Sequence, residues 1–226
     1  MFGQKNWLVI LVKAHELEIF GHDSKVSTVL TIPTTVINNL EILDRDGLYS
    51  LVANWAKTLT YQATEIIWIL SSSVVFEQTF ADSDKERWDT LIVQFLDAVP
   101  FEEILSKTYN PAGGKSVIAT NQDLLTGLNQ AFAAQGYTTK VVVSGKMAGV
   151  ENNLTPDLVK KVLGNMTQLY RENLVIPDEE KSNFVPGTPS VSAGAVPAKP
   201  KSQLPLLLSV FGVLLAILAI VIYLNQ

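Results

Sequence analysis

Three short patterns in the sequence resemble sites of catalysis or ligand binding, but each lacks residues that its chemistry needs. The first, Gly113-Gly-Lys-Ser116, resembles the end of a phosphate-binding loop. Such a loop also needs a small residue five positions before Gly114, where this chain has Tyr109, and it must lie between a strand and a helix. Because Ser116 begins a strand-like run, the segment from Asn110 to Gly114 predicts a hairpin turn instead.

Histidine and serine supply the other two patterns. The only imidazoles are His15 and His22, near the expected first hairpin. His15 and Glu16 point to opposite faces of a strand and cannot hold one metal ion together, while His22 is typical of a solvated turn. The three serines from Ser71 lack the flanking glycines of a nucleophile elbow and are expected to satisfy backbone groups between strands. We therefore expect no catalytic residue, metal site or cofactor.

Composition narrows the function further. The chain has 226 residues, with 17 Lys and Arg against 22 Asp and Glu, and a net charge of −5. No basic stripe is present, which excludes nucleic acid as the expected partner. The absence of cysteine excludes disulfides, thiolate zinc sites and cysteine nucleophiles.

Strand and helix patterns alternate over the first 145 residues. Alternating apolar and polar residues, or clusters of β-branched ones, predict strands. These lie at 7–12, 15–20, 26–32, 65–70, 74–80, 116–120 and 137–143, and the first three form an expected antiparallel meander. Capping residues and apolar residues at helical spacing predict helices after Asp44 or Asp46, from Asp84, over 122–135 before Gly136, and from Thr155 to Arg171. The pattern predicts a mixed α/β domain.

The character of the chain changes after residue 176. Residues 177–203 are rich in proline, glycine, serine and alanine, which predicts a disordered, extended tether. Residues 204–224 then carry no charge over 21 positions, which is long enough for a helix to cross a hydrocarbon core of about 30 Å. A buried core helix is the alternative. The residues assigned to the membrane anchor include Leu204, Leu208, Phe211, Leu215, Ile220 and Tyr223.

The sequence also predicts how this anchor lies in the membrane. The apolar run at residues 7–12 is too short for the core of a secretory signal. Lys199 and Lys201 precede the anchor, an arrangement that places the domain in the cytoplasm and a single-pass helix in the cytoplasmic membrane. Gly212 and Ala216 are spaced for close helix packing, so a homo- or hetero-oligomer through the membrane helix is possible.

The order of elements and three segments carry a family resemblance. The segments are Leu96-Asp-Ala-Val-Pro-Phe-Glu-Glu103, Ser116-Val-Ile-Ala-Thr-Asn-Gln122 and Ala134-Gln-Gly-Tyr-Thr138. Together they resemble the first lobe of the actin-like proteins of type IV pilus machinery, the PilM family, whose fold also serves as the cytoplasmic domain of GspL-type secretion anchors. The resemblance implies an α/β (α+β), ribonuclease H-like half-fold over residues 1–145, with a C-terminal helix within 146–176.

The departures from that family bear on activity. An actin-like ATPase opens with Asp-x-Gly-x-x-x-Lys, but the matching stretch from Leu11 to Glu16 has neither the aspartate nor the glycine. The second lobe is also missing from the pattern, so we expect a pseudo-ATPase. The resemblance implies a membrane-anchored, non-enzymatic scaffold of an inner-membrane pilus or type II secretion-like assembly, with Pro100, Phe101 and Glu102 as candidate contacts. The alternative is a membrane-anchored enzyme or nucleotide sensor whose site a partner lobe completes.

Overall fold

The computed structural model describes residues 7–21, 27–58, 65–111 and 113–175. All of them belong to the first of two compact units, Met1–Ala195. The second unit, Val196–Gln226, lies outside the described residues, as do the predicted tether and anchor. No helix in the described part of the chain is both long and apolar enough to span a bilayer.

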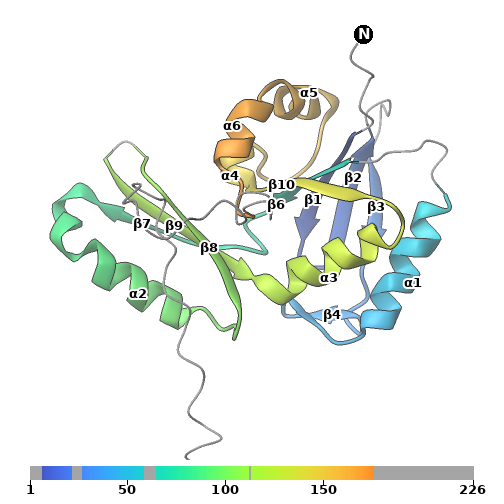
Figure 1. Cartoon of the computed structure of the whole chain (residues 1–226), viewed down its shortest axis with the longest axis horizontal. Helices are drawn as coiled ribbons and strands as arrows, with labels where there is room; N and C mark the ends of the chain where they lie inside the picture. Colours follow the sequence, from blue (N-terminus) through green and yellow to red (C-terminus); the bar gives the residue numbers. More distant parts are fainter. Residues whose placement is uncertain (1–6, 22–26, 59–64, 112, 176–226) are drawn as a thin grey trace, which may run out of the picture. The chain divides into compact units, whose positions relative to one another are not determined.

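A five-stranded sheet forms the centre of the domain (Figure 1). Its strands run in the order β10-β6-β1-β2-β3. β1 is antiparallel to β2, and β2 is antiparallel to β3, so the predicted meander is confirmed. β6 and β10 run parallel to β1 and join it on the other side. The bounds are Trp7–Lys13 for β1, Glu16–Gly21 for β2, Thr28–Thr31 for β3, Glu65–Leu70 for β6 and Thr138–Ser144 for β10.

Helices cover both faces of this sheet, which is why β1 and β6 are buried almost throughout. α1 (Arg45–Ala56) packs beside α3 (Gln122–Ala133) on one face. There Phe132 meets Trp68 edge-to-face, with ring centroids 5.1 Å apart. The other face carries α4 (Gly145–Ala148), α5 (Pro156–Gly164) and α6 (Met166–Arg171), as Figure 1 shows.

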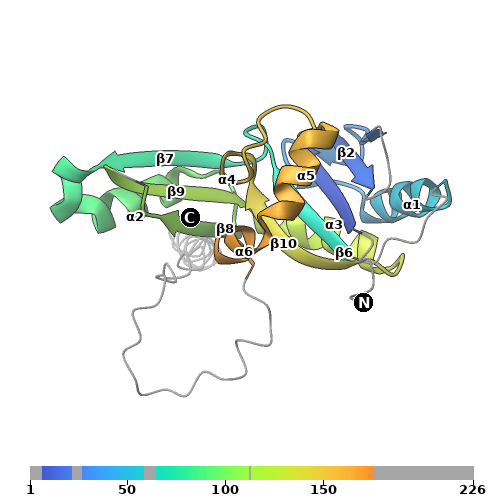
Figure 2. The same ribbon diagram turned by 90° about the horizontal axis from the view of Figure 1, so that it is seen from above.

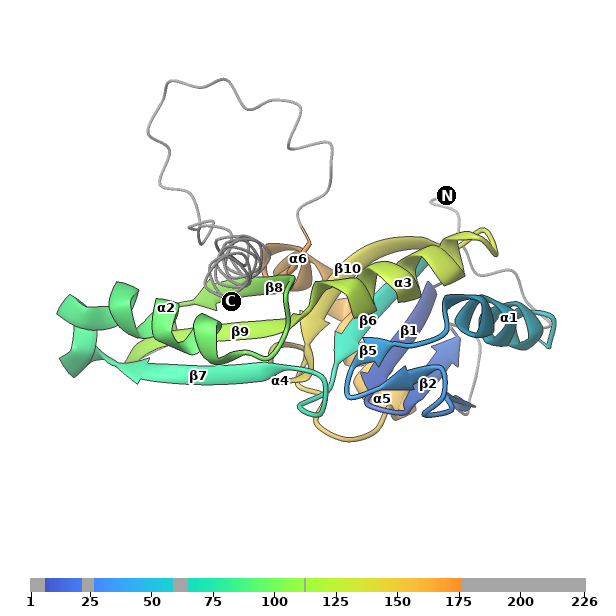
Figure 3. The same cartoon turned by 90° about the horizontal axis from the view of Figure 1, so that it is seen from below.

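A second, smaller sheet is inserted between β6 and α3 (Figure 2). Its strands β7 (Phe76–Ala81), β9 (Gly114–Asn121) and β8 (Ile104–Tyr109) are antiparallel, in the order β7-β9-β8. The 3-10 turn Asp82–Arg87 leads into α2 (Trp88–Ala98), which lies along one face of this sheet (Figure 3). A short hairpin precedes α1. Its two strands, β4 (Ile37–Asn38) and β5 (Glu41–Ile42), have two residues each.

Most local predictions are confirmed, but one predicted helix is corrected and the strand β8 was not predicted. Asp44, rather than Asp46, caps α1 by accepting the Gly47 N–H at 2.9 Å. The Asn110 to Gly114 segment is the predicted hairpin turn. The helix predicted from Thr155 to Arg171 is instead two helices that break at Asn165, because Gly164 and Asn165 are both poor helix formers. The short helix α4 was not predicted.

Candidate functional site

Open α/β sheets bind ligands outside the carboxyl ends of their parallel strands. In this domain that edge lies where β1, β6 and β10 end, at Lys13, Leu70 and Ser144. This edge is therefore the first place to look for a ligand site.

The β1–β2 hairpin fills this edge with an internal charge cluster. Lys13 Nζ lies 2.7 Å from Glu16 Oε1 and 3.2 Å from Glu18 Oε2, and it donates to Asn153 Oδ1 at 3.1 Å. The Glu18 side chain is only 7% exposed, and its Oε1 accepts the Leu154 N–H at 3.1 Å. With two carboxylates around one ammonium, the cluster carries a net negative charge that opposes an incoming phosphate.

The pKa of Lys13 reflects this balance. Burial lowers the pKa, but hydrogen bonds and charge interactions with Glu16 and Glu18 outweigh burial and raise the pKa above its usual 10.5. Lys13 therefore stays protonated at neutral pH and is fully engaged by the protein's own carboxylates.

The serines after β6 form hydrogen bonds with backbone groups and with each other, as the sequence predicts. Ser73 Oγ accepts the N–H of Ala14 at 3.2 Å, and it lies 2.7 Å from Ser71 Oγ. The Ser71 N–H donates to the carbonyl of Val12 at 3.0 Å. The turn that would present free amides to a phosphate in an actin-like enzyme therefore has its Ala14 amide occupied.

The end of β10 is closed by backbone. A Cβ on Gly145 would lie 2.3 Å from the Val150 carbonyl oxygen and 3.3 Å from that of Leu70. Val150 is fully buried, and its N–H donates back to Gly145 O at 2.8 Å. The turn at Gly149 and Val150 thus closes α4 against Gly145, and Asn153 and Leu154 contact Lys13 and Glu18 at the same edge.

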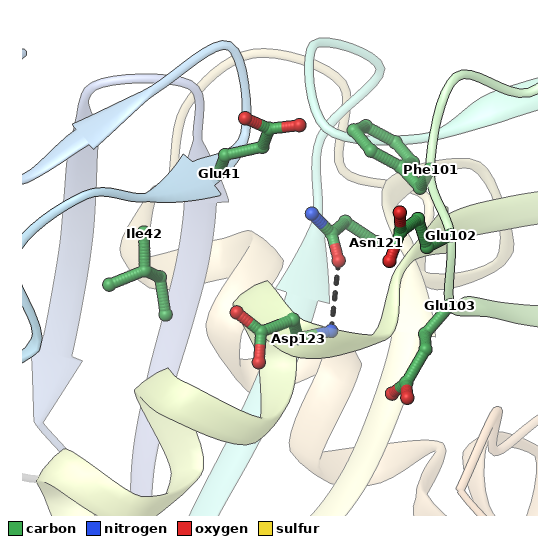
Figure 4. A pocket seen from close by; sticks show the side chains of 7 residues that line it. All are labelled: Glu41, Ile42, Phe101, Glu102, Glu103, Asn121 and Asp123. Atoms are coloured by element: carbon green, nitrogen blue, oxygen red, sulfur yellow. Dashed lines mark hydrogen bonds between the residues drawn. The ribbon is translucent and has the colours of Figure 1, made fainter. Parts of the chain in front are cut away.

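A groove of about 410 Å³ lies elsewhere, between the β4–β5 hairpin, the start of α3 and the turn after α2 (Figure 4). Two of the three candidate contacts from the sequence, Phe101 and Glu102, line it. Phe101 is buried and packs edge-to-face on Phe76 with centroids 5.7 Å apart, whereas Glu102 is exposed. Pro100 is exposed but does not line the groove. The lining residues are Glu41, Ile42, Phe101, Glu102, Glu103, Asn121 and Asp123.

The rim of the groove is acidic. Asp123 pairs with Arg45, which leaves the carboxylates of Glu41, Glu102 and Glu103 without an ion pair within the described ranges. These three residues are exposed, and Ile42 and Phe101 supply apolar surface between them. The groove therefore offers a negatively charged rim, with a smaller apolar contribution from Ile42 and Phe101.

Asn121 holds the two sides of the groove in place. It is 5% exposed, and its Oδ1 accepts the N–H of Asp123 at 2.9 Å (Figure 4) and of Leu124 at 3.4 Å, which caps α3. Its Nδ2 donates to the carbonyl of Leu40, in the turn of the β4–β5 hairpin, at 2.9 Å. Sequence reasoning missed this role, although an Asn directly before a helical pattern is a capping signal.

Other predicted site residues lie elsewhere or cannot be placed. His22 falls outside the described residues, as do the anchor residues and the Gly212–Ala216 pair. In the described ranges, no group of three or more His, Cys, Asp or Glu side chains is arranged to hold a metal ion. Glu41 and Asp123 were not candidates, because only the tertiary fold brings them beside Glu102.

Several solved structures are similar to this chain. No family model matches the sequence, and no curated protein matches it. The PilM–PilN type IV pilus biogenesis complex matches with a TM-score of 0.46 and 16% identity, over 63% of this chain and 48% of that chain. The cytoplasmic domain of EpsL, an inner-membrane component of the type II secretion system of Vibrio cholerae, matches with a TM-score of 0.40 and 11% identity, over 63% of this chain and 58% of that chain.

A third solved structure is a protein with an actin-like ATPase fold from Bacteroides thetaiotaomicron. It matches with a TM-score of 0.34 and 12% identity, over 64% of this chain and 54% of that chain. This chain thus spans about half the length of the solved chains it matches. The first two come from a pilus and a secretion machinery, the two kinds of assembly that the sequence resemblance names.

The charge cluster predicts a large effect of Lys13→Met. This change leaves Glu18 buried without its cation, which costs about 3 kcal/mol and lowers the melting temperature of the full-length chain in detergent by roughly 6–12 °C. Because the folded-state pKa of Lys13 is raised, the stabilisation is present below pH 10.5 and is lost as the pH rises through that raised value. Lys85→Met, at an exposed position, is the control. Equal melting temperatures for the two variants would contradict this role of Lys13.

The closed end of β10 predicts opposite effects for two glycine substitutions. Gly145→Ala drives a Cβ into the Val150 carbonyl and should destabilise the chain by about 2 kcal/mol. Gly164→Ala, with nothing within 4 Å of its added Cβ, should be neutral or stabilising by up to about 1 kcal/mol. Thermal unfolding followed by tryptophan fluorescence measures both. A tolerated Gly145→Ala would mean that the edge has room for a ligand.

Proposed function

We propose that this chain is a membrane-anchored, non-enzymatic scaffold that holds a segment of a partner protein in the groove beside Phe101. The assembly it serves is of the type IV pilus or type II secretion kind, which is what the sequence resemblance implies. The observation that carries the proposal is the groove itself, because three exposed carboxylates with no ion pair among the described residues gather there beside Ile42 and Phe101.

The contents of the sheet edge support a non-enzymatic role. The ammonium of Lys13, the Ala14 amide and the space beside Gly145 are all taken by the protein's own groups. Binding phosphate there would require breaking the Lys13 cluster and moving the backbone at Val150. We infer that recognition has shifted from this edge to the groove.

The groove also indicates the chemistry of its occupant. A segment with an apolar side chain fits over Ile42 and Phe101, and a Lys, an Arg or a free α-amino group complements Glu41, Glu102 and Glu103. Rim charges chiefly steer association and add salt dependence, whereas the apolar side chain supplies most of the affinity.

The predicted anchor adds to this function by raising local concentration. A tether over residues 177–203 and a membrane helix over 204–224 would keep the groove near other proteins of the same membrane. Such confinement strengthens a weak interaction without any new contact.

Site-specific photo-crosslinking in the native membrane tests the proposal. A photoreactive residue in place of Glu102 should capture one inner-membrane protein, identified by mass spectrometry as a pilus or secretion component. The same residue in place of Val93, exposed on α2, should not capture it. Glu41→Lys, with the probe at Glu102, should reduce the adduct about tenfold, while the equally exposed Glu86→Lys should leave it unchanged.

Two outcomes would count against the scaffold. One is an adduct that forms equally from positions 102 and 93 or ignores Glu41→Lys, because the contact would then lie outside the groove. The other is saturable binding of Mg-ATP to the full-length chain in isothermal titration calorimetry, with or without the captured partner, which would favour the nucleotide-sensor alternative.

A further inference from the structure

The last residue of α6 and the four residues that follow it contact both sheets. Residues 171–175 are called here the clamp. On one side it meets β8 of the inserted sheet. Lys107 Nζ donates to the carbonyls of Arg171 at 2.6 Å and Asn173 at 2.9 Å, and the Tyr109 hydroxyl donates to Glu172 O at 3.3 Å. Figures 2 and 3 both show the end of α6 beside β8 and β10.

On its other side the clamp pairs with the edge of the five-stranded sheet. The N–H of Val142 in β10 donates to Asn173 Oδ1 at 2.8 Å, and the Leu174 N–H donates to Val142 O at 2.8 Å. Leu174 is 4% exposed, so its side chain is part of the core. The clamp therefore joins β10 to β8, two strands from different sheets.

Lys107 supplies two of the hydrogen bonds that make this connection. The carbonyl of Arg171, the last residue of α6, has no partner within its own helix, and a cationic donor at a helix C-terminus is favourable. Burial lowers the pKa of Lys107, and the charge of Glu172 opposes that shift. A second cross-sheet contact, Lys146 with Glu77, involves a lysine that is 62% exposed and contributes little.

The clamp is positioned to resist rotation of the inserted sheet. The chain passes from β9 into α3 at Asn121, opposite Ile104 at the start of β8. Tyr109 pairs with Ser116, five residues farther along, which at about 3.3 Å per residue is roughly 16 Å from that crossing. A connection at such a distance from the crossing limits a hinge motion that the two covalent crossings alone would permit.

We propose that the clamp fixes the angle between the two sheets and thereby sets the width of the groove beside Phe101. The groove has Glu41 and Asp123 on the side of the five-stranded sheet and Phe101 to Glu103 on the side of the inserted sheet. Any change in the angle therefore changes its width. The consequence for partner binding rests on the proposed function. The effect of the clamp on the sheet angle and the groove width does not.

The clamp also connects the groove to whatever acts on the C-terminal segment. Residue 175 is the last described residue, and the predicted tether begins two positions later. Tension on the tether, or a protein that displaces the clamp, would release the inserted sheet and change the affinity of the groove. By reciprocity, an occupant that prefers one groove width would stabilise or loosen the clamp.

Distance measurements between spin labels test the clamp in the full-length chain. The sequence has no cysteine, so Glu41→Cys with Glu102→Cys gives one labelled pair across the groove, at exposed positions. In detergent and without a partner, Lys107→Met should broaden the distance distribution and shift it to longer distances. It should also speed hydrogen exchange at the Val142 and Leu174 amides. Lys85→Met should change neither.

An unchanged distance distribution in Lys107→Met, with native circular dichroism, would overturn the clamp. If that variant fails to fold, Tyr109→Phe removes a single hydrogen bond and is read in the same way. The distance measurement needs no partner. A result that overturns the clamp therefore leaves the scaffold proposal standing. Conversely, absence of a crosslinked partner would leave the clamp intact.

Discussion

A buried carboxylate needs a cation and hydrogen-bond donors, and Glu18 constrains the carboxyl-end edge of the central sheet for that reason. It lies on β2, its cation Lys13 ends β1, and its backbone donor is Leu154, more than a hundred residues later. Satisfying one side chain thus fixes the first hairpin and the loop before α5 together. The charged groups at this edge are therefore engaged by one another and by the backbone.

The groove lies away from this edge and is built by a different set of contacts. The junction of the two sheets provides these contacts, because Asn121 holds the β4–β5 hairpin against α3 while Phe101 packs under the inserted sheet. In the proposal above, the clamp spans the same junction at a distance from the groove, so both depend on the angle between the two sheets.

The sequence predicted the five strands of the central sheet because burial on both faces leaves apolar runs, as in β6, and an exposed face leaves alternation, as in β3. It also located the helix caps at Asp44 and Thr155, since capping is a local interaction. The break at Asn165 was missed because the apolar spacing continues across it. Phe101 and Glu102 were found through a family motif, whereas Glu41, Asn121 and Asp123 join them only through pairings about 20 to 80 residues apart, which no local pattern records.

The inserted sheet leaves and rejoins the central domain at nearly one point. The hydroxyl of Thr120, at the end of β9, donates to the carbonyl of Val74, before β7, at 2.7 Å. A segment whose ends meet in this way can be exchanged for a short loop without changing the order or register of the strands around it. Replacing the three strands and α2 by such a loop is therefore expected to leave the five-stranded sheet intact.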